Sequence, residues 1–497
     1  MHVRNLPLLG LMTLGYAAAF AGEVNLWPVV VEQRPDRGAT DAVTRTGAGP
    51  LLFSQSLPAG RPDGTVRARG FRPFYVEMVD GAGETSEAHL LYPLFSYRRL
   101  VDGHRWSVFS LVNRHTHGRD GATPPTHRGF DLWPFYFSRQ TPYPESSYRA
   151  VLPLYGSVPN RFGQDRLTWV AFPLYARWER NGVTTTTAPW PLVKVLRGEG
   201  NRGFELWPLF GHREKPGVYR EQFYLWPLLF QRETGLDASA PSVTRGFLPF
   251  YTDTRTPEYQ SRTYLWPFFG SLQRTSPYRY HQVNYLWPVW VQGRGDDRYL
   301  NRWGPFYTRS QVKGVDKTWI AWPLWRRQGW TDGPLRHTQR RLLYFVYHDT
   351  EQRSATNPAL PAARKLHLWP LLSLWDNGAG RRQVQALSPL EVFFPGNEPV
   401  QLTYSPLFAL YRYDRRNPEE RRHSLLWNVV TYRRSPSGRT FHLGPLLSAE
   451  RHDQARRLAL GNGLISLRRD AAADERWRLR FFDFKSRPSR RTTSPAP

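Results

Sequence analysis

The stretch Tyr264-Leu265-Trp266-Pro267-Phe268-Phe269 decides the fold, because the chain repeats its pattern along most of its length. The core of the repeat is Leu-Trp-Pro, followed by two or three large apolar residues. Seven copies keep all three core residues: Leu26-Trp27-Pro28, Leu132-Trp133-Pro134, Leu206-Trp207-Pro208, Leu225-Trp226-Pro227, Leu265-Trp266-Pro267, Leu286-Trp287-Pro288 and Leu368-Trp369-Pro370. Degenerate copies fill the gaps, so an anchor recurs about every 20 residues, as in proteins built from one repeated supersecondary unit.

Clusters of turn-forming residues separate the anchors. Examples are Thr275-Ser276-Pro277, Gly293-Arg294-Gly295-Asp296-Asp297 and Thr331-Asp332-Gly333-Pro334. The segments between them are about 12 to 15 residues long and rich in aromatic and β-branched residues, which is typical of strands. The pattern excludes a helical interpretation. Proline recurs in the middle of each unit, and the apolar residues do not recur at intervals of three and four residues. We therefore predict an all-β fold, a long antiparallel meander of about 22 to 24 repeated strands with a mid-strand proline.

The repeated proline leaves two alternatives for each segment. Proline cannot donate to the hydrogen-bond ladder of a sheet, so either a long strand bends or bulges there, or two short strands are joined at the proline. We expect the meander to close as a large barrel, and a β-sandwich or a solenoid-like repeat is the alternative.

The apolar cluster predicts large side chains on both faces of the sheet. In the quoted stretch, alternation puts Leu265 and Phe269 on one face and Tyr264, Trp266 and Phe268 on the other. Six to eight such residues span roughly 20 to 27 Å, close to the ~25 Å apolar band of an outer-membrane barrel. The apolar second face argues against that barrel, whose lumen is polar. A soluble protein with a Trp- and Leu-filled core is the alternative.

The residues we expect to carry the repeat are structural tryptophans. If they fill a core, replacing one by alanine costs about 3 to 5 kcal/mol. They are Trp27, Trp133, Trp207, Trp226, Trp266, Trp287, Trp322 and Trp369.

The start of the chain predicts export. Arg4 precedes an apolar run from Leu6 to Phe20, and Ala19-Phe20-Ala21 offers small residues at a cleavage site, which is the layout of a secretory signal peptide. The run is shorter than the ~20 residues of a membrane-spanning helix, so we expect its removal. The expected organisation is a signal peptide over 1–21, a tandem-repeat β domain over 22–485 and a basic disordered tail over 486–497.

Composition narrows the possible partners. The absence of cysteine excludes disulfides, thiolate zinc sites and a lipoprotein anchor. The formal charge of +27 would suggest nucleic acid in a cytosolic protein, but export makes nucleic acid an unexpected partner here. The anionic partners of a cell envelope are instead outer-membrane lipid, lipopolysaccharide and acidic polysaccharide.

The sequence offers little catalytic chemistry. His115-Thr116-His117 places two imidazoles on one face of a strand, but the neighbouring Gly118-Arg119-Asp120 favours a solvated turn over a metal site. The acids within strand segments, which a glycosidase would need in pairs, lie in different repeats and are expected to meet arginines across strand pairs. They are Glu77, Glu205, Glu391 and Asp483. We predict a protein that is not an enzyme and has no cofactor or metal.

The tandem Leu-Trp-Pro-Leu-Phe pattern behind a signal peptide resembles an uncharacterised group of exported repeat proteins of Gram-negative bacteria. The resemblance covers Leu26 to about Phe484 and implies no catalytic or binding residue. The expected function is that of a non-enzymatic protein of the outer membrane, integrated or associated, with a structural or passage role. The alternative is a periplasmic or surface scaffold that binds acidic glycan or lipopolysaccharide through Trp, Tyr and Arg.

Overall fold

The computed structural model describes residues 23–33, 43–57, 61, 64–118, 127–452, 455–469 and 476–483. The expected signal peptide and basic tail lie outside these residues and stay predictions. The chain divides into two compact units. Unit 2 is Pro93–Leu368, and unit 1 consists of Met1–Tyr92 together with Trp369–Pro497.

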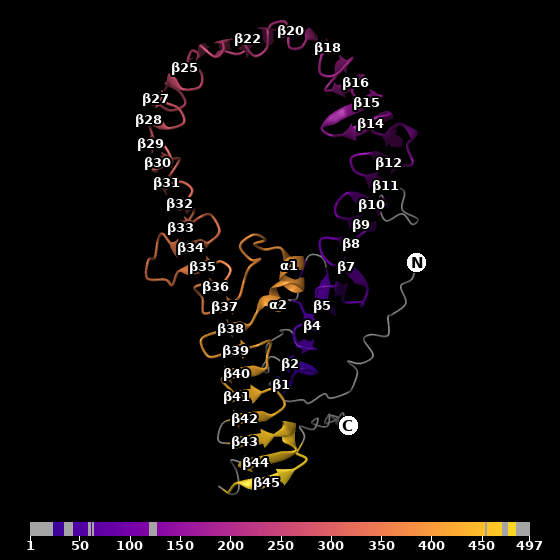
Figure 1. Cartoon of the computed structure of the whole chain (residues 1–497), viewed down its shortest axis with the longest axis vertical. Helices are drawn as coiled ribbons and strands as arrows, with labels where there is room; N and C mark the ends of the chain where they lie inside the picture. The colour runs from indigo at the N-terminus through magenta and orange to yellow at the C-terminus, as the bar shows by residue number, and fades with distance from the viewer. Residues whose placement is uncertain are drawn as a thin grey trace, which may run out of the picture. The chain divides into compact units, whose positions relative to one another are not determined.

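Both units are built from short antiparallel strands that follow one another in chain order, 45 in the described part of the chain (Figure 1). The pairings join strands that are neighbours in the sequence, so the predicted all-β meander is confirmed. Closure of the meander into a barrel stays a prediction.

The predicted count of about 22 to 24 strands with a mid-strand proline is wrong, and the alternative of two short strands joined at the proline is the one that the structure has. Each expected long strand is two short strands, and the Leu-Trp-Pro core is the turn between them. The quoted repeat shows this, since β25 (Tyr259–Tyr264) and β26 (Phe269–Arg274) pair on either side of Leu265-Trp266-Pro267-Phe268. The physical reason is that proline lacks the N–H that a strand interior needs, whereas a turn needs no donor there.

Unit 2 contains β8 to β35. Their bounds are β8 Phe95–Leu100, β9 Gly103–Val108, β10 Val112–His117, β11 His127–Leu132, β12 Tyr136–Gln140, β13 Tyr148–Val151, β14 Tyr155–Arg161, β15 Gln164–Val170, β16 Tyr175–Arg180, β17 Val183–Thr187, β18 Val193–Gly198, β19 Asn201–Leu206, β20 Phe210–Lys215, β21 Tyr219–Tyr224, β22 Leu229–Thr234, β23 Ser242–Phe247, β24 Tyr251–Thr256, β25 and β26 as above, β27 Tyr280–Leu286, β28 Trp290–Gly295, β29 Arg298–Trp303, β30 Tyr307–Val312, β31 Val315–Ile320, β32 Trp325–Asp332, β33 Leu335–Leu342, β34 Tyr347–Ser354 and β35 Ala363–Leu368.

Buried apolar side chains are concentrated in one part of unit 2, over β12 to β16. The cluster consists of Phe137, Ala150, Val158, Trp169 and Ala176. Elsewhere, single aromatic rings cover glycines of the adjacent strand: a Cβ at Gly246 would lie 2.1 Å from the Phe230 ring. Cross-strand pairs of this kind, rather than a thick core, stabilise the sheet locally.

Unit 1 contains β1 to β7, β36 to β45 and two short helices. Their bounds are β1 Glu23–Leu26, β2 Val30–Gln33, β3 Thr44–Gly47, β4 Leu52–Ser56, β5 Thr65–Phe71, β6 Tyr75–Asp80, β7 Thr85–Leu90, β36 Leu372–Asp376, β37 Arg382–Ala386, α1 Glu398–Thr403, α2 Ser405–Phe408, β38 Tyr411–Arg415, β39 Arg421–Leu425, β40 Val430–Ser435, β41 Gly438–Leu443, β42 Leu447–His452, β43 Ala455–Leu460, β44 Ile465–Arg469 and β45 Arg478–Phe481.

Contacts between distant parts of the sequence hold unit 1 together. Leu402 of α1 packs into a buried cluster with Phe53, Val76 and Met78 of the first strands. The side chain of Asn397 accepts a hydrogen bond from Val400 N at 3.0 Å and so caps α1.

An ion pair joins strands that are 399 residues apart in the sequence. Arg422 of β39 donates to both oxygens of Glu23 in β1, at 2.9 and 2.8 Å, and the Glu23 side chain is 1 % exposed. Burial by itself raises the pKa of Glu23, but the charge and hydrogen bonds of Arg422 outweigh burial and hold that pKa below its ordinary value. The Glu23 carboxylate is therefore ionised in the folded state.

Replacing Glu23 by glutamine should destabilise the protein by about 3 to 5 kcal/mol, because Arg422 is left buried without its counter-charge. The depressed folded pKa also means that the Glu23 contribution is complete above the ordinary pKa of glutamate and is lost as pH falls through the folded value. Urea unfolding between neutral and acidic pH should show a smaller acid loss for Glu23→Gln than for the wild type.

The matched control is Asp316→Asn, which breaks the exposed pair between Arg309 and Asp316, each 55 % exposed. It should change the free energy of unfolding by less than about 1 kcal/mol. Equal effects of the two substitutions would contradict a special role for the buried pair.

Candidate functional site

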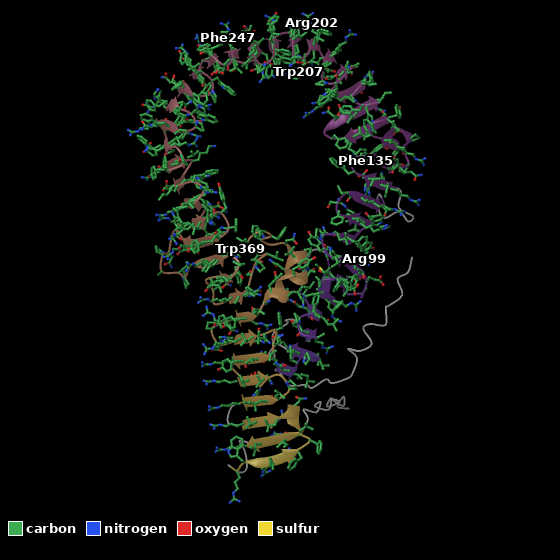
Figure 2. The ribbon with its side chains drawn as sticks, viewed as in Figure 1. Arg99, Phe135, Arg202, Trp207, Phe247 and Trp369 are labelled. Atoms are coloured by element: carbon green, nitrogen blue, oxygen red, sulfur yellow. The ribbon has the colours of Figure 1, made fainter. Side chains whose placement is uncertain are left out.

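Two kinds of turn alternate along unit 2. After β19, the chain turns through Leu206-Trp207-Pro208-Leu209; after β20, it turns through Pro216-Gly217-Val218. Because successive strands are antiparallel, every second turn lies at the same edge of the sheet. We call the edge that carries the Leu-Trp-Pro turns and their degenerate copies the apolar edge, and the opposite one the polar edge. In Figure 2, Arg202 and Trp207 mark the two ends of β19.

The apolar edge of unit 2 is exposed. Apart from half-buried residues such as Leu152, Phe172 and Leu248, the large side chains in its turns have at least 36 % of their surface accessible, up to 75 % at Phe306. These side chains are Trp133, Phe135, Leu154, Leu174, Trp190, Leu192, Trp207, Leu209, Leu225, Trp226, Leu228, Phe250, Leu265, Trp266, Phe268, Trp287, Val289, Phe306, Trp322 and Leu324. A monomeric soluble protein rarely exposes a contiguous apolar patch of this extent.

Neighbouring turns of the apolar edge are joined by backbone hydrogen bonds. Trp226 N donates to Pro208 O at 2.7 Å, and Trp287 N donates to Phe268 O at 2.7 Å. Within a turn, Leu228 N donates to Leu225 O at 2.7 Å. The hydrogen-bond ladder of the sheet thus continues through the turns, and the prolines have no N–H that needs an acceptor.

The alternative in which the tryptophans fill a core does not describe six of them. Trp133, Trp207, Trp226, Trp266, Trp287 and Trp322 are 40 to 57 % exposed. Trp226 contacts the half-buried rings of Phe223 and Phe230, at centroid distances of 5.7 and 5.8 Å. Alternation along a single strand predicts the wrong positions for these tryptophans. The apolar pattern runs through a turn, so residues predicted on two faces of the sheet lie together at one edge.

The height of the apolar band changes for the same reason. Because the apolar run folds back on itself, the band consists of the turn and about two residues of each adjoining strand. Its height along the strands is roughly 7 to 10 Å, instead of the predicted 20 to 27 Å. Beyond this band, the strands carry many arginines and acidic residues.

In unit 1, equivalent turns are partly covered by the segment around α1 and α2. Trp27 and Trp369 are only half-exposed. Trp369 donates from Nε1 to Pro389 O at 3.0 Å and meets the ring of Phe393 edge-on. Arg72, in the turn after β5, donates to Leu402 O of α1 at 2.5 Å. The same kind of turn is therefore covered in part within the chain in unit 1, although Val29, Leu371 and Leu446 stay exposed, and is mostly open in unit 2.

The strands of unit 2 carry ladders of ion pairs. Glu214 on β20 accepts from Arg202 of β19 at 2.6 Å and from Arg220 of β21 at 3.3 Å. The hydrogen bond from Arg202 is the main cause that lowers the pKa of Glu214. Glu221 likewise lies between Arg213 and Arg232. These acids serve the sheet as counter-ions.

The acids singled out from the sequence have partners of this kind and are not brought together in pairs. Glu77 pairs across the strands with Arg69 at 2.6 Å, as expected. Glu205 pairs with Lys194 at 2.8 Å, so its closest cation is a lysine, and Asp483 pairs with Arg457 at 3.2 Å. Glu391 lies in a turn rather than a strand.

The two histidines of the candidate metal pair lie in strand β10, not in the solvated turn that we favoured. The rings of His115 and His117 stack at 6.2 Å, and His117 stacks on His127 at 4.6 Å. Burial lowers the pKa of His115. Within the described ranges, no three His, Cys, Asp or Glu side chains are grouped as metal ligands.

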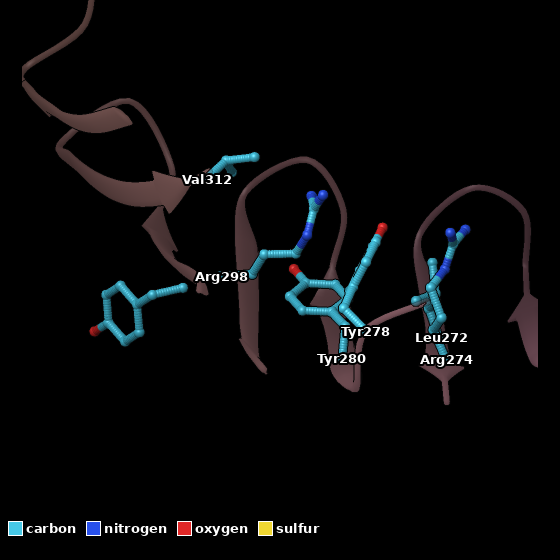
Figure 3. A pocket seen from close by; sticks show the side chains of 7 residues that line it. Leu272, Arg274, Tyr278, Tyr280, Arg298 and Val312 are labelled. Atoms are coloured by element: carbon cyan, nitrogen blue, oxygen red, sulfur yellow. The ribbon is translucent and has the colours of Figure 1, made fainter. Parts of the chain in front are cut away.

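A pocket of 140 Å³ opens near the polar edge of unit 2, over β26 to β30 (Figure 3). Arg274 and Arg298 lie on either side of Tyr278, with Cζ atoms 5.1 and 3.8 Å from its ring centroid. Tyr280 extends over Gly293 and donates to Gln282 at 2.9 Å. No motif in the sequence predicts this pocket. Strand register brings it together, since Arg274 is opposite Tyr280, Tyr280 opposite Gly295, and Gly295 opposite Arg298.

The fold and the two edges define a class of protein: an all-β tandem-repeat sheet with one apolar edge and one polar edge. The sequence matches no protein-family model, and no curated protein matches it at a significant level. No helix in the described part of the chain has the length and hydrophobicity to cross a membrane.

Replacing Trp226 by alanine should cost less than about 2 kcal/mol, because this ring is 44 % exposed and leaves little cavity. Replacing Trp169, which is 4 % exposed, should cost about 3 to 5 kcal/mol. Urea unfolding of the two variants measures the difference. A larger loss for Trp226→Ala than for Trp169→Ala would show that the apolar edge is a core.

Proposed function

We propose that this protein is a non-enzymatic component of a bacterial outer membrane and that the apolar edge of unit 2 inserts into the lipid. The observation that carries the proposal is the exposed row of Trp, Leu and Phe turns whose backbones are hydrogen-bonded to one another. A protein surface that enters lipid needs both exposed apolar side chains and paired backbone groups. Apolar side chains gain from leaving water, and backbone groups that enter an apolar layer must already be paired.

Unit 1 supports the view that these turns need a cover. There, segment 388–410 lies against the turns and supplies apolar and hydrogen-bonding contacts, such as Leu402 and Pro389. In unit 2 most of the corresponding turns are exposed, which supports an external apolar phase as their cover.

The depth of the apolar edge favours the membrane interface. A reach of roughly 7 to 10 Å corresponds to the ~5 to 10 Å that interfacial elements enter the headgroup and acyl boundary. Tryptophan is enriched at that boundary, because its ring is apolar and its N–H remains near water. The net charge of +27 adds attraction to an anionic surface.

We propose in addition that the meander closes into a large barrel, with a structural or passage role. Closure would pair the end strands of the sheet, which otherwise leave unsatisfied backbone groups. The apolar turns would then form an uninterrupted band at one end of the barrel.

Membrane insertion is tested with vesicles of zwitterionic and anionic phospholipid. The wild-type chain should float with the vesicles, and its tryptophan fluorescence should be quenched by brominated acyl chains. A variant with Trp207, Trp226 and Trp266 replaced by serine should bind at least tenfold more weakly, since it loses three interfacial anchors.

The matched control removes three exposed apolar residues of the polar edge, as Val101→Ser, Leu236→Ser and Leu335→Ser. It should bind vesicles as the wild type does, and circular dichroism should show that both triple variants are folded. Undiminished binding by the tryptophan variant, or an equal loss in the control, would rule out insertion through the apolar edge.

Localisation and closure are tested by envelope fractionation followed by electrophoresis of heated and unheated samples. We expect the protein in the outer-membrane fraction, and faster migration without heating if the sheet is closed. A species that is washed off with salt and shows no heat shift would contradict integration and favour a scaffold at the periplasm or surface.

A scaffold that binds acidic glycan or lipopolysaccharide is the second candidate. The observation that favours it is the pocket at the polar edge, where arginine and tyrosine side chains converge. The two candidates use opposite edges of the sheet and do not exclude each other.

A further inference from the structure

We propose that the pocket formed by Arg274, Tyr278, Tyr280 and Arg298 binds the phosphate monoester of a phosphorylated sugar. The inference deepens the second candidate function and does not depend on membrane insertion.

Three donors converge at the mouth of the pocket. The guanidinium groups of Arg274 and Arg298 flank Tyr278, and its hydroxyl points to the same side as both of them (Figure 3). The two Cζ atoms can be at most about 9 Å apart, which is the sum of their distances of 5.1 and 3.8 Å from the Tyr278 ring centroid. An oxyanion held between two guanidinium groups needs a separation of this order when each N–H···O bond is about 2.8 Å.

The charge of the pocket is not neutralised from within the described chain. Among the described residues, neither Arg274 nor Arg298 forms an ion pair with a carboxylate, whereas Glu214, Glu221 and Asp253 each pair with two arginines on the same sheet. Aromatic rings take the place of acids here, since Arg274 also lies over Tyr259, with its Cζ 5.0 Å from the ring centroid. A stacked arginine keeps its in-plane N–H donors free for a ligand.

Two unneutralised guanidinium groups match a dianion. A phosphate monoester carries about −1.5 to −2 charges at neutral pH, whereas a carboxylate or a phosphodiester carries one. Arginine also matches the geometry of phosphate oxygens through paired N–H donors. The pocket is therefore better suited to a terminal phosphate than to a uronic acid or a phospholipid diester.

The shape of the pocket sets the size of the ligand. Tyr280, which lines the pocket, lies over Gly293 of β28, where a Cβ would meet the Tyr280 hydroxyl at 2.2 Å. The volume of 140 Å³ is close to that of a cavity of about 150 Å³ that admits one benzene ring. This space holds one phosphate group with the edge of the sugar that carries it, and Leu272 and Val312 supply apolar walls.

The test is calorimetric titration of the full chain with inorganic phosphate, glucose phosphate and glucose. Both phosphates should bind with one site per chain, and glucose should not bind. Arg274→Gln and Arg298→Gln should each weaken phosphate binding at least tenfold. Gly293→Ala, whose Cβ would displace the Tyr280 ring that lines the pocket, should weaken the binding of glucose phosphate while the net charge stays the same.

Arg294→Gln is the matched control, because Arg294 is an exposed arginine of β28 outside the pocket lining. It removes the same charge and should bind phosphate as the wild type does. An equal loss in Arg294→Gln, or unchanged binding in both pocket variants, would overturn the site, since binding would then reflect the overall positive charge.

Two sources of the phosphate are separated by the same variants. Lipopolysaccharide that retains its sugar phosphates, but not enzymatically dephosphorylated lipopolysaccharide, should bind in a manner that requires Arg274 and Arg298 if the ligand is a membrane sugar. Binding of glucose phosphate alone would identify a soluble sugar phosphate. Oligosaccharide binding that neither variant changes would overturn this pocket but leave the second candidate function standing, with its site elsewhere.

Discussion

The structure depends on one constraint: each backbone donor of a narrow sheet must find an acceptor on the strand or turn beside it. With strands of mostly four to eight residues, there is too little surface for a thick core, and hydrogen bonds between neighbours are the only interaction present throughout. The turns obey the same constraint. Trp226 donates to Pro208 across adjacent turns, and proline stands where a donor would have no partner.

The two units differ in how their apolar side chains are arranged in the absence of a thick core. Unit 1 joins β1 to β39 through Glu23 and Arg422 and buries Phe53, Val76 and Met78 against Leu402. Unit 2 buries one cluster around Trp169 and otherwise leaves apolar side chains at its edge. Exposed apolar surface of this extent is typical of an interaction site, and we propose the membrane as its first candidate partner.

The sequence was sufficient to predict an all-β antiparallel meander, because turn clusters such as Gly293 to Asp297 punctuate it at short intervals. It did not place Trp266 and Pro267 correctly, since an alternating apolar run looks the same on a strand and on the two sides of a tight turn. The length of the segments was the unused signal. Segments of about 12 to 15 residues are twice the common strand length, as expected for a folded pair.

Long-range pairs were beyond prediction for a different reason. Glu23 and Arg422 are 399 residues apart, and nothing local in either segment specifies the other. Arg274 and Arg298 are close in sequence, but they converge only through the register of the strands between them. A prediction would require each hairpin to be placed to the exact residue, because a slip of one residue moves every side chain to the opposite face.

The nearest-neighbour ladder of unit 2 has a consequence for how such a chain evolves. In the described part of unit 2, the strands of each hairpin are hydrogen-bonded to those of the hairpins before and after it. If one hairpin is lost or duplicated, its neighbours can therefore pair in its place. The chemistry of both edges survives such an event, and only the extent of the sheet changes. The number of hairpins, more than the identity of any one side chain, is then the quantity that natural variation can adjust, in steps of about 20 residues.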